Sequence, residues 1–439
     1  MVAPEIDRRL FLAAALTLIA TTGCGTSEEA VTAIVGAKLI DGTGAEPVEN
    51  VTVVIRGDRI EAVGASGEVD VSGAQVLDAS GQVLMPGLVD LHIHYGGGEK
   101  GLRQQFAMQL EFGVTTARSL GADDEANVAL MHAANAGELP APRLYTAGTG
   151  FSHPNGMLAG VPFINKPTST TEAREMVQKL SSQGVHLVKM WVDGTLDGSL
   201  ALGPLPKITA EIRTAVVEEA AAHGLPAVAH IFDEEDVRQL NAAGVRHFVH
   251  TVRREPVDDA FTRWAKAQEL TFAPALSKAQ DSWYLAENPQ ELEDPGLVKA
   301  FGDARIAWFK TPDRRDEMLA NPQGPQLRKV YAHMQRFVKQ MQDGGVTIAV
   351  GSDSGAGNVA FGWGAHHEMK LLVEAGLTPL QALTAGTGNG AYVLEGDDAE
   401  FGTIRAGKVA DLLLLDADPT IDIDNSRRIA RVMQGGVWL

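Results

Sequence analysis

Residues 87–94, with the sequence GLVDLHIH, form a short apolar stretch that ends in two histidines separated by one residue. Such a run bounded by glycine predicts a β-strand, and side chains two residues apart on a strand point to the same face. His92 and His94 therefore leave the strand side by side. Two neighbouring imidazoles pack poorly in an apolar interior but are good metal ligands. The stretch thus predicts a strand that carries part of a metal site.

Seven further apolar segments follow at intervals, and the segments between them, such as 171–183, 209–223 and 326–343, have apolar residues at helical spacing. Strands that alternate with helices in this number predict a (β/α)₈ TIM barrel over residues 85–396. A doubly wound open sheet is the alternative. The seven further predicted strands are 114–119, 144–147, 187–192, 227–231, 248–251, 271–275 and 347–352.

The segments that flank the barrel have a different texture. Residues 31–84 contain short alternating runs separated by glycine turns, which predict antiparallel strands, and residues 397–439 return to the same pattern. Each segment is too small to bury a core alone, so we expect the two to pair into one small β-sandwich domain.

Residues 281–325 interrupt the rhythm of the barrel and are too long for an ordinary connection. They follow the seventh predicted strand, where loops reach the C-terminal face of a barrel. We expect a lid or substrate wall, with simple packing decoration as the alternative. The insertion contains the aromatic residues Trp283, Tyr284, Trp308 and Phe309.

Residues 1–24 have the pattern of an export signal. Arg8 and Arg9 precede an apolar run that is too short to span a membrane as a helix. The twin arginines resemble a signal that exports folded proteins. Cys24, the only cysteine, lies where a bacterial lipoprotein is cleaved and acylated, although Thr21 replaces the usual leucine three residues before it. We expect a periplasmic or lipid-anchored bacterial protein without internal disulfides, with plain signal cleavage as the alternative.

The net charge of −19 limits the classes of partner. An acidic surface of this size argues against binding to nucleic acid and against attachment to anionic lipid through a basic face. We expect a small-molecule substrate and a homo-oligomer.

Further polar residues fall at or within the predicted strands. His230 and His250 lie near the ends of two of them, as His92 and His94 do. Lys189 lies within an apolar strand, where an amine must lose its charge or find a partner. A neutral amine reacts with CO₂ to form a carbamate that can bridge two metals. Alternatively, Lys189 forms an ion pair with an aspartate in the barrel interior, or its side chain extends to place the amine at the rim of the barrel. Asp353 lies in a GSDSG segment at the end of the eighth predicted strand, where it can supply a carboxylate ligand to the site. The alternative is that its side chain only caps the turn.

These stretches together resemble the amidohydrolase superfamily, in its imidazolonepropionase-like, prolidase-like and ochratoxinase-like branch. The resemblance covers about residues 31–439. The stretches that carry it are 85–94, 113–116, 188–194, 229–230, 250, 351–353 and 402–412.

The resemblance implies a site with two divalent cations. His92, His94 and Asp353 would hold the more buried ion, His230 and His250 would hold the other, and carboxylated Lys189 would bridge them. Imidazolonepropionases use one metal and lack this lysine, so the lysine favours the two-metal peptidase-like relatives. The sequence WVDG at 191–194 differs from the small residues of characterised carboxypeptidases in this branch, which argues against carboxypeptidase specificity.

The chemistry that follows is hydrolysis of an amide bond by a hydroxide that bridges the metals, in a dipeptide or an N-acyl amino acid. Asp353 would take the proton of the attacking water and deliver it to the leaving nitrogen. Zinc suits the nitrogen and oxygen ligands, and manganese or cobalt could substitute. Alternatives are hydrolysis of a cyclic amide, lactone or other ester at the same site, and, in another class, a non-catalytic metal-dependent surface binding protein.

Two residues are candidates for substrate contacts. Arg118 lies near the end of the second predicted strand, and His153 lies in the glycine-rich loop at 148–156. A rim ion pair for Arg118 and a loop cap for His153 are the alternatives. Three weaker candidates, Tyr145, His366 and His367, are interpreted as structural.

Overall fold

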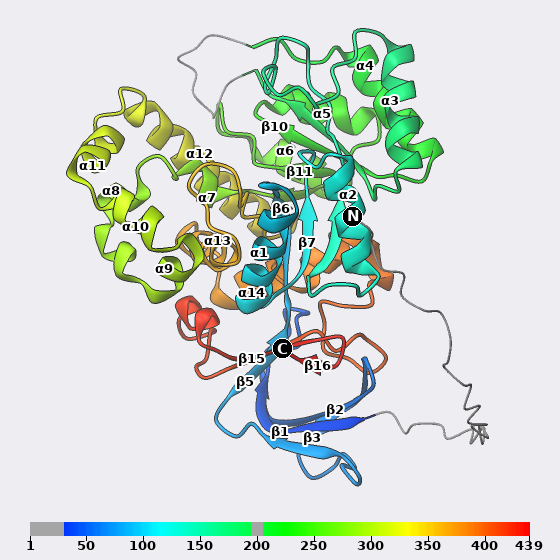
Figure 1. The fold of residues 1–439 in the computed structure, drawn as a ribbon, viewed down its shortest axis with the longest axis vertical. Coiled ribbons are helices and arrows are strands. Elements are labelled where there is room, and N and C mark those ends of the chain that lie inside the picture. Colours follow the sequence, from blue (N-terminus) through cyan, green and yellow to red (C-terminus); the bar gives the residue numbers. More distant parts are fainter. Residues whose placement is uncertain (1–29, 195–204) are drawn as a thin grey trace, which may run out of the picture.

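A computed structural model describes residues 30–194 and 205–439 (Figure 1). The predicted export segment, with Cys24, lies outside the described residues. Figure 1 shows a helix-wrapped barrel above a sheet built from both ends of the chain. Among the described residues, no helix has both the length and the apolar character needed to cross a membrane.

The barrel confirms the predicted fold class. Its strands pair in parallel in two sets, β6-β7-β8 and β9-β10-β11-β12-β13. Side chains on one face of these strands form an inner core, and those on the other face pack under the helices. The strands are β6 (Leu88–Ile93), β7 (Val114–Ser119), β8 (Arg143–Thr146), β9 (Val188–Val192), β10 (Ala227–Ile231), β11 (His247–Val249), β12 (Thr271–Ala273) and β13 (Thr347–Ile348).

Hydrogen bonds outside the regular ladders close the barrel at two seams. At the first, Phe151 lies beyond β8 and donates its N–H to Lys189 O at 2.8 Å. At the second, Leu91 N donates to Val350 O at 3.0 Å and Asp353 N to His92 O at 2.7 Å. The eighth predicted strand, 347–352, is therefore a two-residue ladder followed by an extended segment that pairs with β6. The second seam brings the first and last strands of the barrel together at their C-terminal ends.

Helices cover the outside of the barrel and begin at capping residues that the sequence supplies. The side chains of Asp124, Ser169, Thr209 and Asp258 each accept a backbone N–H of the first turn. The covering helices are α1 (Gly98–Glu111), α2 (Glu125–Asn135), α3 (Thr170–Ser182), α4 (Ala210–Ala222), α5 (Glu234–Ala242), α6 (Asp259–Ala267), α12 (Gly324–Asp343), α13 (Trp363–Glu374), α14 (Pro379–Ala385) and α15 (Gly388–Glu395).

The two ends of the chain form one sheet, as the sequence predicts. β14 pairs antiparallel with β5, so that Leu412 lies opposite Pro86 and residues from both ends share one core. The predicted domain limit between residues 84 and 85 stays a prediction, because β5 joins the terminal sheet and continues directly towards β6. The strands, in spatial order, are β16 (Val437–Trp438), β15 (Ile429–Gln434), β14 (Leu412–Leu415), β5 (Val83–Pro86), β1 (Val31–Leu39), β2 (Val48–Arg56) and β3 (Arg59–Ala65), with β4 (Gln75–Asp78) against β1.

The insertion at 281–325 folds into short helices beside the barrel (Figure 1). Their apolar side chains pack on one another and on Phe112 and Trp363. The active-site cavity described below is lined by no residue of 281–325. Both the role as a lid or substrate wall and the alternative, packing decoration, therefore stay predictions. The helices are α8 (Tyr284–Glu287), η2 (Pro289–Glu293), α9 (Pro295–Phe301), α10 (Asp303–Phe309) and α11 (Pro312–Leu319).

Candidate active site

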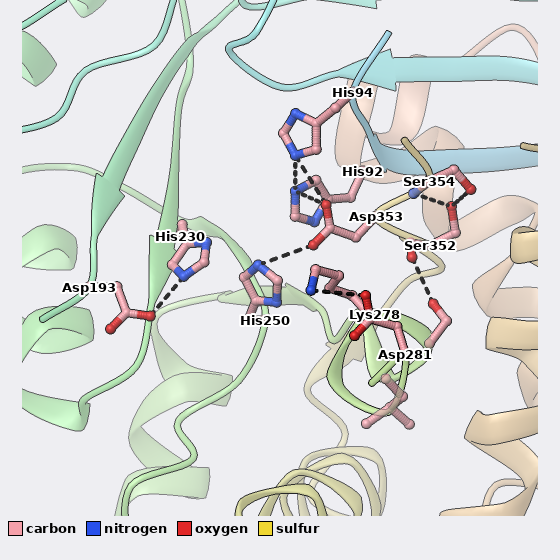
Figure 2. A network of polar contacts seen from close by, with 12 residues as sticks. His92, His94, Asp193, His230, His250, Lys278, Asp281, Ser352, Asp353 and Ser354 are labelled. Carbon is pink, nitrogen blue, oxygen red and sulfur yellow. Dashed lines mark hydrogen bonds and ion pairs between the residues drawn. The ribbon is translucent and has the colours of Figure 1, made fainter. Parts of the chain in front are cut away.

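Three of the predicted ligands meet at the second barrel seam (Figure 2). His92 Nε2 lies 3.2 Å from His94 Nε2 and 3.4 Å from Asp353 Oδ1. His94 Nε2 lies 3.1 Å from the same carboxylate oxygen. Three ligand atoms at such distances form a nearly equilateral triangle. Ligands bound tetrahedrally to one zinc ion at about 2.1 Å stand roughly 3.4 Å apart. The triangle therefore has the dimensions of one face of a metal coordination shell.

The other two histidines extend this group towards β10 and β11. His250 Nε2 lies 3.7 Å from Asp353 Oδ2, and the rings of His230 and His250 are 4.1 Å apart at their centroids. His250 and Asp353 both have a left-handed backbone, with φ near 65° and 60°. Non-glycine residues in this region are uncommon and are found at functional sites, where the surrounding structure holds them.

Lys189 lies on β9 and its side chain is fully buried. Its Nζ has no hydrogen-bond partner among the described residues and lies 5.6 Å from the centre of the Trp191 ring. Burial lowers the pKa of Lys189 to about 7, with Asp353 opposing the shift and Arg118 adding to it. A large fraction of this amine is thus uncharged at neutral pH, which is the form that reacts with CO₂.

The ionisation of the other groups suits metal binding. Burial lowers the pKa of His92 and of His250 well below the usual range, and that of His230 to about 4. Burial alone would raise the pKa of Asp353, but His92 and His94 outweigh it and lower the pKa well below its usual range. His92, His230 and His250 are therefore neutral imidazoles at neutral pH, and Asp353 is an ionised carboxylate. These are the protonation states that a divalent cation needs.

The residues present fit a metal centre. Nitrogen and oxygen ligand atoms face one another at the distances given above, and two further atoms, His92 Nδ1 and His250 Nδ1, are buried without a partner among the described residues. His92, His250 and Asp353 each bring one ligand atom to within 4.8 Å of the others. Imidazole and carboxylate ligands are those that zinc and related divalent ions take.

Asp90 supports the triangle from below and was not among the predicted site residues. It is fully buried and accepts hydrogen bonds from the backbone N–H groups of His92, at 3.2 Å, and Ser352, at 2.9 Å. Ser352 Oγ also donates to it, at 2.5 Å. Burial raises its pKa to about 6. One carboxylate thus fixes the strand that carries His92 and the segment that carries Asp353.

The cavity above the histidines has a volume of about 230 Å³. Its wall combines apolar side chains, which include Met157, Leu158 and Trp191, with two cationic ones, Arg253 and Lys278. The ring of Trp191 fits closely under the loop after β8, because a Cβ at Gly150 would lie 2.4 Å from it. A glycine is therefore required there.

The structure does not bring the two predicted substrate contacts to this cavity. Arg118 is buried in the barrel, where its Nε donates to Leu91 O at 2.9 Å, and it is not part of the cavity wall. His153 Nδ1 accepts the N–H of Asn155 at 3.1 Å, so it caps its own loop and lies outside the wall. Substrate contacts by Arg118 and His153 therefore stay predictions, and neither residue lines the cavity described here.

Sequence reasoning also passed over Asp193, Arg253 and Lys278. Asp193 Oδ2 lies 2.9 Å from His230 Nε2 and 3.1 Å from Arg253 Nη2. Lys278 Nζ lies 3.1 Å from Asp281 Oδ2. Each follows the end of a barrel strand, which is the face where active-site residues gather. Their position after the ends of predicted strands was the feature of the sequence that could have identified them as site residues.

The three weaker candidates have structural partners. His366 contacts Ser426 Oγ at 2.9 Å and Phe112 O at 2.8 Å, and His367 Nε2 lies 2.7 Å from Gln280 Nε2. Tyr145 donates to Glu395. None of them is part of the cavity wall.

A (β/α)₈ barrel with imidazoles and a carboxylate grouped at the C-terminal ends of its strands defines a class of metal-dependent hydrolase. The chain belongs to the Amidohydrolase family, whose model matches residues 83–439. It is therefore a metal-dependent amidohydrolase, an enzyme that acts on carbon–nitrogen bonds.

Individual relatives are distant. The chain is 24% identical to an ochratoxinase of Aspergillus niger over 458 residues, which cover 94% of the chain and 87% of the relative. It is 27% identical to an imidazolonepropionase of Anaeromyxobacter dehalogenans, over 82% of the chain and 83% of that relative. Among solved structures, a Xaa-Pro dipeptidase with bound methionine in its active site superposes with a TM-score of 0.74 at 22% identity, over 93% of this chain and 100% of that chain. This superposition shows the shared fold.

Proposed function

We propose that the enzyme hydrolyses the amide bond of a small substrate that carries a free carboxylate, such as an N-acyl amino acid or a dipeptide, with the help of two divalent cations. The observation that carries this proposal is the triangle of His92, His94 and Asp353 at the base of a cavity walled by apolar side chains and by Arg253 and Lys278. The names of the dipeptidase and ochratoxinase relatives are consistent with it.

The proposed mechanism assigns a role to each of the six predicted ligand residues. His92, His94 and Asp353 would hold one cation, and His230 and His250 would hold the other, with carboxylated Lys189 between them. When bound, such cations polarise a carbonyl and lower the pKa of water, and zinc suits this ligand set. Asp353, ionised at neutral pH, would accept the proton of the attacking water and then donate it to the leaving nitrogen.

The wall of the cavity would select the substrate. Met157, Leu158 and Trp191 offer an apolar surface for the acyl group. Arg253 and Lys278 are the cationic groups of the described wall and would attract a carboxylate, because a guanidinium or ammonium at a partly dry site binds it through charge-assisted hydrogen bonds. The expected substrate is thus apolar at one end and anionic at the other.

The test compares two substrates that share one scissile bond. Zinc-loaded enzyme should hydrolyse an N-acyl amino acid with a kcat/KM about 10 to 100 times higher than that of its C-terminal carboxamide, since a charged contact is lost. Arg253→Met should reduce this preference mainly through KM. Arg254→Met is the matched control, because the neighbouring guanidinium pairs with Asp233 and is not part of the cavity wall.

Two results would contradict the proposal. Equal rates for the acid and the carboxamide, unchanged in Arg253→Met, would remove the carboxylate from the substrate class. Turnover of lactones or other esters but of no amide would replace the proposed reaction.

We also propose that the chain is exported and held at a bacterial membrane by a lipid on Cys24. The twin arginines, the short apolar run and the cysteine that follows support this. Cys24→Ser should move the protein from the membrane to the soluble fraction after cell lysis, with Arg254→Met as an exported control. An unchanged distribution, together with no incorporation of labelled fatty acid into the original chain, would rule out the lipid.

A further inference from the structure

Asp193 occupies a position that the proposed mechanism does not use. It follows the last residue of β9, and its side chain is fully shielded from solvent. The neighbouring strand pairs in register, with Trp191 opposite His230, so the Asp193 carboxylate lies beside the His230 ring at the C-terminal ends of β9 and β10. Figure 2 shows His230 between Asp193 and the group formed by His92, Asp353 and His250.

The contact between these two residues determines which ring nitrogen of His230 carries the proton. His230 Nε2 lies 2.9 Å from Asp193 Oδ2. An ionised carboxylate can only accept, so a lone pair on Nε2 would oppose the oxygen at this distance. Arg253 Nη2 donates to the same oxygen at 3.1 Å, which favours the ionised carboxylate. Arg253 Nη2 also lies 3.3 Å from His230 Nε2 and could donate only to a lone pair there, but the contact of Nε2 with the carboxylate is the shorter one. A lone pair on Nε2 would therefore face Asp193 Oδ2 at the closer distance, so Nε2 carries the hydrogen and the lone pair lies on Nδ1.

His92 and His94 are held in a different way. Their Nε2 atoms face each other and Asp353 in the triangle, so they offer Nε2 as the ligand atom. Among the described contacts, neither has a carboxylate partner other than Asp353, and neither does His250. Of the four histidines, His230 is the one paired with a carboxylate that lies outside the predicted ligand set.

We propose that Asp193 is a positioning residue for the second cation: it binds the Nε2–H of His230 and thereby presents Nδ1 as the ligand atom. The inference rests on the proposed two-cation function. A carboxylate that accepts from the distal nitrogen of a ligand histidine fixes the ring and makes the other nitrogen more basic, and its loss costs about 10- to 100-fold in metal affinity. Arg253 links this pair to the cavity wall, so the same carboxylate orders a ligand and a side chain that faces the substrate.

The experiment titrates metal-free protein with Co²⁺ against a competing chelator and follows the visible absorption of the bound ion. Asp193→Leu should weaken the lower-affinity ion about 10- to 100-fold and leave the other unchanged. The affinity of Asp193→Asn for this ion should lie between those of the wild-type protein and Asp193→Leu, because the amide oxygen still accepts a hydrogen bond but carries no charge. Asp233→Asn is the control, a neighbouring carboxylate that pairs with Lys207 and Arg254 and not with His230.

A second measurement needs no variant at Asp193. In metal-free protein labelled with ¹⁵N-histidine, the signals absent from His230→Asn identify this ring, and the proton should lie on Nε2. A proton on Nδ1, or unchanged affinity for both ions in a folded Asp193→Leu variant, would overturn the inference and leave the two-cation function intact. A wild-type chain that binds a single ion would overturn both.

Discussion

Lys189→Met is expected to bind one divalent cation per chain where the wild-type protein binds two, and to lose at least about 100-fold in kcat. Lys189 is the buried amine with no hydrogen-bond partner among the described residues, within electrostatic reach of Asp353 and the histidines. Methionine has a similar length but cannot form a carbamate. The second ion would then lack its bridging ligand.

Lys189→Met lowers activity but should raise the stability of the metal-free protein. A buried amine without a hydrogen bond is destabilising, so its replacement by an apolar side chain of similar size should raise the free energy of unfolding by about 1 kcal/mol. Replacement of Lys189 by methionine would thus stabilise the fold and remove most turnover.

Two measurements decide this prediction. Metal analysis after purification with bicarbonate gives the number of ions per chain, and ¹³CO₂ labelling should give a carbamate carbon signal in the wild-type protein that the methionine variant lacks. A Lys189→Met protein that retains two ions and full turnover would refute the bridging role.

Asp353→Asn is expected to preserve the fold and lower kcat by about 10² to 10⁴-fold. Asparagine suits this position because it tolerates the left-handed backbone, with φ near 60°, better than most residues. The amide keeps the shape of the carboxylate but cannot accept a proton from water. Asp353→Ala would add backbone strain and is the poorer test.

The control for this variant is the state of the bound metal. With cations in saturating excess, Asp353→Asn should recover its ions but not its activity, which separates proton transfer from ligation. A kcat within a few-fold of the wild-type value would exclude Asp353 as the group that moves the proton.

The fold could be predicted from the sequence because its signals are local. Strands 114–119 (VTTARS) and 227–231 (AVAHI) have the limits predicted for them, and every residue in both is buried. Each stands out in the sequence as a short segment between stretches with helical spacing. The last strand could not be delimited in this way. Its ladder covers only Thr347–Ile348, because the rest of the segment bonds to β6 across the seam, which is a long-range contact.

The candidate ligands were also predictable, because residues at strand ends in a barrel converge whatever their separation in sequence. The substrate wall was not. Arg118 follows the same strand-end pattern as the histidines, yet its side chain turns into the interior and binds Leu91 O. Arg253 lies beyond its strand and reaches the cavity because Asp193 binds it, and no spacing rule encodes that contact.

The seam between β6 and the segment that contains Asp353 has a consequence for the order of assembly. The triangle does not exist until the first and last strands of the barrel have met, so a chain still emerging from synthesis, or one cut before residue 353, holds His92 and His94 but no complete binding site. A cation bound after the barrel has closed would link β6 to the segment that contains Asp353. Bound metal should therefore lower the rate of unfolding and leave the rate of folding unchanged. The lifetime of the folded enzyme would then depend on the bound cation and not on how fast the chain folds.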